Sequence, residues 1–391
     1  MPTSPVPAPV PALRFGVEEE FLLVDAATGT SAPRAGQVLV DASQVLGDRA
    51  QSEFYTTQVE GCTPPVRAAT ALYGELTGMR RAMAAAASRA GCLLVASGSA
   101  VLPSVHPLPV TDTGRYRRIA ALLGPVADQV GGEICGCHVH IGDLTRSEAL
   151  AVANRLRPWL SVLQALGANS PFCEGRDSGL ASSRVVHYSG WPTFGPPPVL
   201  TESGYERLVD RLVASGVILD RRMVYWFARP SEHLPTLEVR IADVNADIDV
   251  TVLLAVLVRG LTQVFLTEAR SGAGCPRVAQ AALHAAHRRA ALAGLRGTGL
   301  DPVTGEPAAM PRLLARLLDR AAPGLEAAGD LSRAHALTAH VLRNGTGADR
   351  QRSALTHHTT LRGVVDHLAD LTTTGPTPQP DPPPPGAAVA A

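Results

Sequence analysis

The sequence contains no lysine, so its 35 cationic residues other than histidine are all arginines, balanced by 35 aspartates and glutamates. This absence excludes the reaction classes that depend on a lysine amine. A P-loop nucleotide site needs its lysine beside the phosphates, and Schiff-base enzymes, pyridoxal enzymes and Ser-Lys hydrolases also require one. Any anion must therefore be bound by arginine, by a metal ion or by backbone groups.

Charge of one sign, cysteine and long apolar stretches are also scarce. The net charge is zero and no run of arginines exceeds two, which argues against a general nucleic-acid binder. The six cysteines lack the density of a disulfide scaffold, the longest apolar stretch (250–258) is too short to span a bilayer, and the start does not resemble a secretory signal. We expect a cytoplasmic protein with small-molecule partners, without nucleic acid or membrane partners, and with a homo-oligomer as one possible assembly.

The chain of 391 residues is 46% apolar and can bury a large core. Proline-rich ends predict disordered tails over 1–12 and 372–391. Between them we expect one catalytic domain, 13–371, that is β-rich over 13–245 and helical over 248–371. The last two predicted strands lie close enough for a hairpin, which favours an α+β fold with a largely antiparallel sheet. Strands are predicted at 13–24, 53–60, 92–97, 134–141, 223–227 and 236–241, and helices at 66–90, 115–130, 147–166, 205–214 and 250–270, with about five more between 276 and 371.

Three consecutive glutamates interrupt the first apolar strand. Because side chains alternate across a strand, Glu18 and Glu20 share one face and Glu19 points away. Two carboxylates about 7 Å apart on one face repel each other unless a cation lies between them. An isolated pair of this kind is nevertheless more often a charged sheet edge.

A second acidic segment contains Glu53 and Glu60. Strict alternation places them on opposite faces, so one must lie past a bulge or at the end of the strand for both to reach one site. This spacing alone is weak support for a site.

The segment Cys135-Gly136-Cys137-His138-Val139-His140 combines two types of soft metal ligand. Alternation places the cysteines on one face, as small core residues, and His138 and His140 on the other. An imidazole among carboxylates is compatible with Mn²⁺ or Mg²⁺, but it is a less specific indication of these ions than of zinc. A lone His-x-His pair is about as often structural as ligating.

Glu238 and Arg240 share one face of the strand predicted at 236–241. A carboxylate beside an arginine suits metal-assisted phosphoryl chemistry, because the guanidinium fork matches a phosphate. The alternative is a simple ion pair at a partly exposed position.

The polar segment 169–184 follows a predicted helix and has no apolar periodicity. Loops of this length in a compact domain are usually functional or disordered. Its two arginines, Arg176 and Arg184, could bind an anionic substrate.

As a set, these segments favour a metal site over charged edges, since four strands carry acidic or histidine residues and a sheet has only two edges. A concave face that gathers them could hold two or three hard divalent cations and, through them, a polyphosphate. The predicted ligands are Glu18, Glu20, Glu53, Glu60, His138 and Glu238.

Six motifs, taken in order, resemble the type 2 glutamate–cysteine ligases, also called carboxylate–amine ligases, of the glutamine synthetase superfamily. The resemblance covers about residues 13–370. It implies an antiparallel sheet that forms a funnel-like site, covered by helices, in which ATP and a carboxylate meet over Mg²⁺ or Mn²⁺. The motifs are GVEEEFLLVD, Gln58-Val59-Glu60, GCHVHIGD, NSPFCEGRDSGLASSR, LEVRIADV and RNGTGADRQR.

The resemblance also implies how the ligands divide between metals. Glu20 would share one metal with Glu53 and Glu60, near the amino-acid substrate. Glu18 would share another with His138 and Glu238, bridging the ATP phosphates.

For the remaining residues, the resemblance implies contacts with phosphate and substrate. His140 would lie near the phosphates, Arg240 would bind phosphate, and Arg184 would serve the substrate, which makes the two arginines the catalytic candidates. Arg176 and Asn169 are weaker candidates from the substrate loop.

The implied activity is that of an ATP-dependent carbon–nitrogen ligase, which forms an amide or γ-glutamyl bond through an acyl phosphate, with weak glutamate–cysteine ligase activity. No enzyme nucleophile is needed, so the missing lysine is compatible with this chemistry. The alternatives are a binuclear metal hydrolase, a phosphotransferase similar to guanidino kinases, and a non-catalytic sensor of nucleotide or amino acid.

Overall fold

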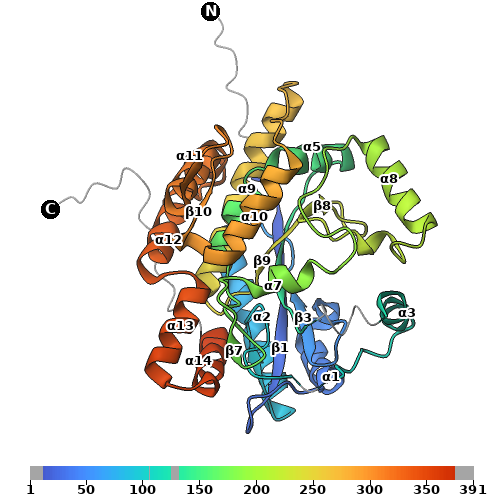
Figure 1. Ribbon diagram of the computed structural model, residues 1–391, viewed down its shortest axis with the longest axis vertical. Helices are drawn as coiled ribbons and strands as arrows, with labels where there is room; N and C mark the ends of the chain where they lie inside the picture. Colours follow the sequence, from blue (N-terminus) through green and yellow to red (C-terminus); the bar gives the residue numbers. More distant parts are fainter. Residues whose placement is uncertain (1–11, 105, 125–131, 375–391) are drawn as a thin grey trace, which may run out of the picture.

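A curved antiparallel sheet forms the centre of the protein. The computed structural model describes residues 12–104, 106–124 and 132–374 (Figure 1). The sheet has seven strands in the order β2-β3-β1-β5-β9-β8, and β4 also pairs with β1. Its pairings are antiparallel, as expected. The strands are β1 (Phe15–Asp25), β2 (Ala50–Ser52), β3 (Gln58–Cys62), β4 (Cys92–Val95), β5 (Gly136–Ile141), β8 (Ala228–Pro230) and β9 (Leu237–Asp243).

Helices cover the sheet and make up nearly all of the C-terminal part of the chain (Figure 1). Two small hairpins complete the fold, one of β6 (Phe172–Cys173) with β7 (Arg176–Asp177) and one of β10 (Thr298–Leu300) with β11 (Pro307–Ala309). The helices are α1 (Ala35–Leu46), α2 (Ala69–Arg89), α3 (Gly114–Leu123), α5 (Arg146–Leu156), α6 (Leu160–Leu166), α7 (Ser183–Tyr188), α8 (Glu202–Ala214), α9 (Ile248–Arg270), α10 (Gln280–Ala293), α11 (Met310–Ala328), α12 (Leu331–Asn344), α13 (Gly347–His358) and α14 (Leu361–Thr374).

The strand β1 organises the sheet because it pairs along both edges. One edge pairs with β3, while the other pairs with β5 over residues 15–19 and with β4 over residues 22–25. Its apolar residues are buried, as expected for a strand rich in Val, Leu and Phe. One hydrophobic cluster contains residues from Leu13 to Ala369, so the β-rich and helical parts share a core.

The helix α9 is apolar on nearly all sides. By length and composition it could cross a membrane, but 83% of its most apolar 18-residue stretch is buried within the protein. A helix of this kind is typical of the centre of a large core. It packs against α11, α5 and β5.

Glu19 and Arg80 form a buried ion pair on the helix-covered side of β1. Their side chains are 0% and 2% exposed, and Arg80 Nε donates to Glu19 Oε2 at 2.8 Å. Arg80 also donates to the backbone oxygens of Asn245 and Ala246, and the Thr251 hydroxyl donates to Glu19. The prediction that Glu19 points away from its two neighbours is therefore confirmed, and its partner comes from α2.

Three predicted elements are wrong in extent. The strand at 53–60 is instead β2 and β3 with a turn between them, and the strand at 223–227 is displaced to β8. The helix at 147–166 is broken into α5 and α6 near Pro158, which cannot donate a backbone hydrogen bond.

Two helices were not predicted, and the ends of the chain differ in part from the expectation. α1 and α7 lie in segments for which no helix was predicted, because their apolar periodicity is short. α14 continues to Thr374, past the start of the tail predicted at 372. Residues 1–11 and 375–391 of the predicted tails, and 125–130 of the helix predicted at 115–130, lie outside the described residues.

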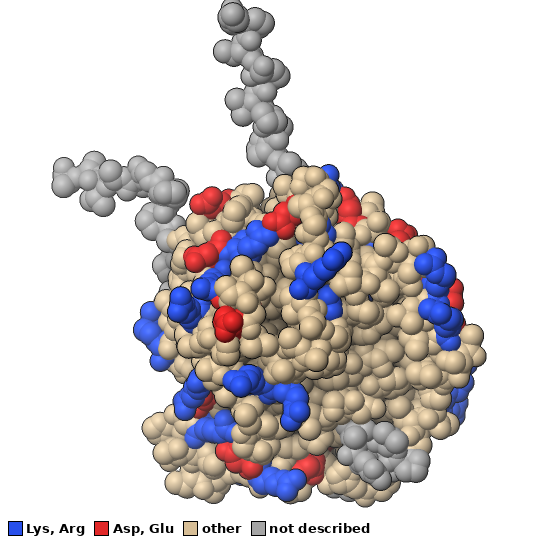
Figure 2. Space-filling view, turned by 45° about the horizontal axis from the view of Figure 1, so that its top comes forward, with Lys and Arg blue, Asp and Glu red and all other residues tan. Residues whose placement is uncertain are grey.

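The charges on one face of the molecule are dispersed. Figure 2 shows arginines in small groups with acidic side chains between them and broad neutral areas around them. This distribution agrees with the zero net charge of the sequence.

Candidate active site

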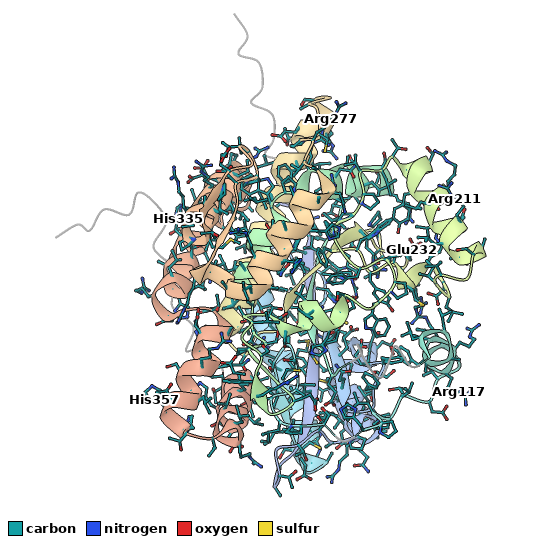
Figure 3. All side chains as sticks on the ribbon, in the orientation of Figure 1. Arg117, Arg211, Glu232, Arg277, His335 and His357 are labelled. Atoms are coloured by element: carbon teal, nitrogen blue, oxygen red, sulfur yellow. The ribbon has the colours of Figure 1, made fainter. Side chains whose placement is uncertain are left out.

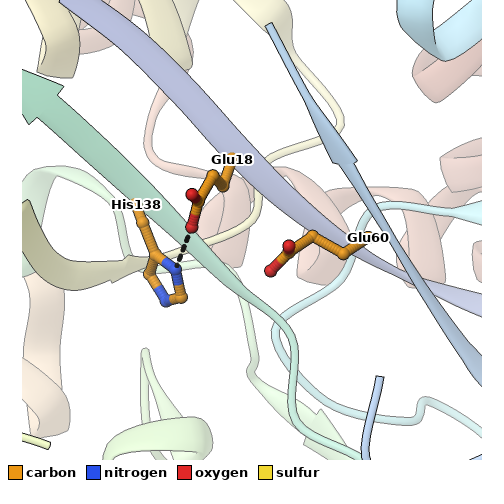
Figure 4. A group of neighbouring side chains, drawn as sticks. All are labelled: Glu18, Glu60 and His138. Atoms are coloured by element: carbon orange, nitrogen blue, oxygen red, sulfur yellow. Dashed lines mark hydrogen bonds and ion pairs between the residues drawn. The ribbon is translucent and has the colours of Figure 1, made fainter. Parts of the chain in front are cut away.

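The strand β1 carries two of the predicted ligands on the side opposite Glu19. Glu20 lies opposite Glu60 of β3, and Glu18 lies opposite His138 of β5. Glu53 follows the end of β2, and one oxygen from each of Glu20, Glu53 and Glu60 lies within 4.8 Å of the others. Figure 4 shows the hydrogen bond between Glu18 and His138, with the Glu60 carboxylate directed towards the same space. Glu53 thus reaches Glu60 from a strand end.

The next two strands extend this row of polar side chains. His140 of β5 lies opposite Glu238 of β9, and Glu238 lies opposite Arg229 of β8. His140 Nε2 lies 3.2 Å from one Glu18 oxygen, and His138 Nδ1 lies 3.3 Å from the other. Glu18, His140 and Glu238 each offer one ligand atom within 4.8 Å of the others.

Two arginines neutralise Glu238. Arg229 Nε donates to one of its oxygens at 3.0 Å, and Arg240 forms an ion pair with the other. Burial opposes ionisation of Glu238, but the charges of Arg229 and Arg240 outweigh it and hold its pKa well below the ordinary value. Glu238 therefore stays ionised at neutral pH.

The two histidines affect Glu18 in the same way. Burial favours a neutral Glu18, but the charge of His140 and hydrogen bonds from His138 and His140 lower its pKa. The pKa of His140 is raised, because the carboxylate of Glu18 outweighs the effect of burial. Burial and then the charge of Arg240 lower the pKa of His138.

At Glu53 and Glu60, burial and neighbouring carboxylates outweigh the charge of Arg240. Burial and the charge of Glu20 raise the pKa of Glu53 to about 8. Burial and the charges of neighbouring glutamates, Glu18 first, raise the pKa of Glu60 well above its ordinary value. This part of the site is short of positive charge, which a divalent cation would supply.

The donor atoms fit Mg²⁺ or Mn²⁺. The buried Nε2 atoms of His138 and His140 lie among these carboxylates, 3.6 Å from Glu20 Oε1 and 3.2 Å from Glu18 Oε1 respectively. Carboxylate oxygens with imidazole nitrogens are a donor set for such ions. The geometry groups His140 with Glu18 and Glu238, and groups His138 with Glu18 and Glu60. This division differs from the one that the resemblance implied, in which His138 accompanies Glu238.

These groups line one cavity of about 500 Å³. The walls come from the sheet, the turn after β2, α3, the segment after α7 and the hairpin of β8 and β9. Most of the predicted site residues line it, namely Glu18, Glu20, Glu53, Glu60, His138, His140, Arg184, Glu238 and Arg240.

Arg184 is held at the cavity by a buried network. Its backbone NH donates to Ser170 Oγ at 3.1 Å, and its Nη1 lies 3.9 Å from Asp243 Oδ1. Asp243 also accepts hydrogen bonds from Asn169 N, Ser170 Oγ and Ser182 Oγ, at 2.8, 2.7 and 2.9 Å. The network ties the polar segment to the end of β9.

Two predicted substrate-loop residues lie elsewhere. Asn169 is buried, and its side-chain NH₂ group donates to the backbone oxygens of Ala96 and Val244 at 3.0 and 2.7 Å. Arg176 is exposed on β7 and does not line the cavity. The structure thus places Asn169 where it holds the loop and Arg176 where it faces solvent, so neither joins the other predicted site residues in the cavity.

Sequence reasoning missed Arg229 and Asp243. Arg229 lies across the hairpin from Glu238, and it could be predicted as a site residue only from the register of β8 and β9. Asp243 ends the same apolar strand as Glu238 and Arg240, and a charged residue at the end of a buried strand could have marked it as a candidate.

The prediction that Cys135 and Cys137 are small core residues is confirmed, since both are buried in the core.

The C-terminal histidines lie outside this cavity. His335 and His357 project from the outer helices in Figure 3, and His287 is buried against Gln164. His340 lies near Asp247 and Asp249 with the spacing of metal ligands, but Arg350 already forms an ion pair with Asp247. These four histidines therefore lie on the surface or in the core, away from the cavity.

The raised pKa of Glu53 predicts a pH-dependent stability. With a folded pKa of about 8 and an ordinary value of 4.5, Glu53 contributes stability that is lost as pH rises between these values. One pKa unit corresponds to about 1.4 kcal/mol, so Glu53→Gln is expected to gain on the order of a few kcal/mol near pH 8. Thermal unfolding in EDTA from pH 5 to pH 8.5 measures this effect. The exposed Glu306→Gln is the control, and parallel curves for both variants would contradict the prediction.

Comparison with known proteins agrees with this geometry. The sequence profile of glutamate–cysteine ligase family 2 matches residues 14–368. A relative in Saccharopolyspora erythraea, provisionally named glutamate–cysteine ligase 2-1, is 44% identical over 359 residues, which are 91% of this chain and 94% of the relative. Another in Salinispora arenicola, provisionally named glutamate–cysteine ligase 2, is 41% identical over 367 residues, covering 93% and 96%.

Solved structures share the fold. The glutamate–cysteine ligase of Francisella tularensis, solved with AMP, has a TM-score of 0.67 at 12% identity and covers 93% of this chain and 90% of its own. A ligase of the prokaryotic ubiquitin-like protein has a TM-score of 0.52 at 14% identity, covering 92% and 71%. The predicted fold class, α+β with a glutamine-synthetase-like sheet, is confirmed. From the match along almost its whole length, the chain belongs to glutamate–cysteine ligase family 2.

Proposed function

We propose that this protein is an ATP-dependent ligase that joins a carboxylate to an amine. The observation that carries the proposal is the row of cross-strand pairs Glu60–Glu20, Glu18–His138 and His140–Glu238 on one wall of the cavity. Family membership and this row point to the same chemistry. The single catalytic domain over 13–371, a cytoplasmic location and small-molecule partners belong to the same proposal.

The reaction consists of two transfers. A carboxylate oxygen of the substrate attacks the γ-phosphorus of ATP, the bond to the bridging oxygen breaks, and ADP leaves with the electron pair. The amine nitrogen then attacks the acyl carbon, inorganic phosphate leaves and the nitrogen loses a proton. Positioning and charge stabilisation supply most of the acceleration in such phosphoryl transfers.

The residues of the chain hold the reacting groups in place. Arg240 borders the cavity beside Glu238 and donates to the Tyr188 hydroxyl at 3.4 Å, so that its guanidinium can bind a phosphate oxygen. Arg184 is suited to the substrate carboxylate or the acyl phosphate, because Asp243 and Ser170 fix its position. Neither role requires a lysine.

Two groups of residues would hold the cations that accompany ATP. Glu18, His140 and Glu238 form one, Glu20, Glu53 and Glu60 form the other, and His138 adjoins both. When bound there, Mg²⁺ or Mn²⁺ neutralises charge on the phosphate oxygens. Glutamate as the carboxylate and cysteine as an amine substrate follow the names of the relatives, and weak use of cysteine is part of the proposal.

The proposal is tested by ADP formation from purified protein over pairs of carboxylates and amines. ADP is expected only when ATP, Mg²⁺ or Mn²⁺, a carboxylate and an amine are all present, and EDTA should reduce the rate to background. Mass spectrometry should find the amide. Turnover without ATP would indicate a hydrolase, a stable phosphorylated product would indicate a kinase, and ATP binding by calorimetry without turnover would indicate a sensor.

A further inference from the structure

One wall of the cavity is aromatic, and the proposed phosphoryl chemistry uses none of it except the hydroxyl of Tyr188. Phe, Tyr and Trp make up only 4% of the chain, yet four of its six tyrosines line this one cavity. So strong a concentration at a polar site calls for a ligand that buries apolar surface. We call these residues the aromatic wall: Phe54, Tyr55, Tyr116, Tyr188, Trp191 and Tyr225.

Trp191 is the centre of the aromatic wall. Its ring centroid lies 5.5 Å from that of Phe54, 5.2 Å from that of Tyr225 and 6.3 Å from that of Tyr188. The Phe54 and Tyr225 rings meet it at 82° and 75°, so they pack edge to face. The wall joins segments that are far apart in the sequence.

The aromatic wall adjoins the groups that hold the reacting atoms. Phe54 directly follows Glu53, and its backbone NH donates to the Glu53 carboxylate at 3.0 Å. The Arg184 guanidinium lies 5.2 Å from the centroid of the Tyr188 ring, and the Tyr188 hydroxyl accepts from Arg240. α7, which ends at Tyr188, crosses in front of the sheet in Figure 1. A side chain bound on this wall would therefore lie next to the acyl phosphate.

The hairpin of β8 and β9 gives the cavity a second wall of different character. Arg229, Ser231 and His233 of the hairpin line it next to Glu238, and Arg222 joins them from the helical turn before β8. Cationic and hydroxyl groups suit the phosphates and sugar of a nucleotide. Because the rings around Trp191 pack at steep angles, they form no parallel pair that could sandwich an adenine.

We propose that the aromatic wall is the subsite for the amine co-substrate, and that it selects a primary amine bearing an aromatic or branched apolar group over cysteine. This inference rests on the proposed ligase function. Burial of apolar surface favours such a group by about 25 cal/mol per Å². The cysteine side chain is too small to cover the wall, so we expect cysteine to be a poor substrate.

The first test uses the wild-type protein with saturating ATP, Mg²⁺ and glutamate. Amide formation is measured with 2-phenylethylamine, benzylamine, isopentylamine, methylamine and cysteine. The apolar amines are expected to exceed methylamine and cysteine at least tenfold in kcat/KM, since one methylene in a fitting pocket changes kcat/KM by about 10–200-fold. Activity that is highest with cysteine or methylamine would overturn the inference and leave the proposed function intact. No ADP with any pair would instead remove the proposed function.

The second test asks whether Trp191 causes the selectivity. Trp191→Ala is expected to lower the kcat/KM ratio of 2-phenylethylamine to methylamine about tenfold or more, whereas Trp191→Phe, which keeps an aromatic ring, should change it less than about threefold. Circular dichroism confirms that both variants fold. An unchanged ratio in Trp191→Ala, or a rise in the KM for ATP in place of the selectivity change, would assign the wall to another ligand and overturn the proposal. If Trp191→Ala does not fold, the wild-type amine profile alone decides.

Discussion

Glu18→Gln is expected to lose about a thousandfold in the rate of ADP formation, equivalent to about 4 kcal/mol of transition-state stabilisation. The amide has nearly the shape of the carboxylate but lacks its charge. Glu18 lies within ion-pair distance of both His138 and His140, and it belongs to two of the groups that could hold a cation. Its replacement therefore removes negative charge shared by two sites.

The neighbouring glutamate supplies a matched comparison. Glu19→Gln alters the same strand by the same chemical change, but on the face that packs against Arg80. We expect Glu18→Gln to fold as the wild type does and to lose activity, and Glu19→Gln to lose stability. A Glu18→Gln protein that retains more than a tenth of wild-type ADP formation would remove Glu18 from the proposed site.

Arg80→Met is expected to destabilise the protein by about 3–5 kcal/mol, because it leaves the carboxylate of Glu19 buried without its partner. Glu19 is 0% exposed, and the two backbone oxygens that accept from Arg80 would also lose their donor. Chemical denaturation measures this loss. Arg81→Met is the control, since Arg81 is the next residue on the same helix and is exposed.

The double variant Glu19→Leu/Arg80→Met tests whether the stability lost in Arg80→Met comes from the unpaired charge of Glu19 or from lost packing. Replacing both members of a buried ion pair with apolar residues is often neutral or stabilising. We therefore expect the double variant to recover most of the stability that Arg80→Met loses. Equal stability of Arg80→Met and Arg81→Met would show that the pair contributes little.

Alternation along single strands was sufficient to place much of the candidate site. It assigned Glu18 and Glu20 to one face and Glu19 to the other, because successive side chains in a strand point to opposite sides. The same rule placed His138 and His140 together and buried the cysteines beside them. These assignments needed no knowledge of which strands are neighbours.

Alternation does not predict which strands are neighbours or in which register they pair. The grouping of His140 with Glu238, and of Arg229 with the same carboxylate, depends on the pairing of β5, β9 and β8. Glu53 reaches the site from the turn after β2, where no periodic pattern applies. Pairing between strands depends on side chains far away in the sequence, so local patterns leave it open.

By itself, the sequence determined the fold class, the family resemblance and the face on which each strand presents its polar residues, since these follow from local periodicity and from motifs in a fixed order. Only the tertiary structure decided that Arg80 neutralises Glu19, that Asn169 anchors the loop, that Arg176 faces solvent, and that aromatic residues from distant segments form one wall. The physical reason is that ion pairs, buried networks and cavity walls depend on distances between residues that the chain brings together only when it folds.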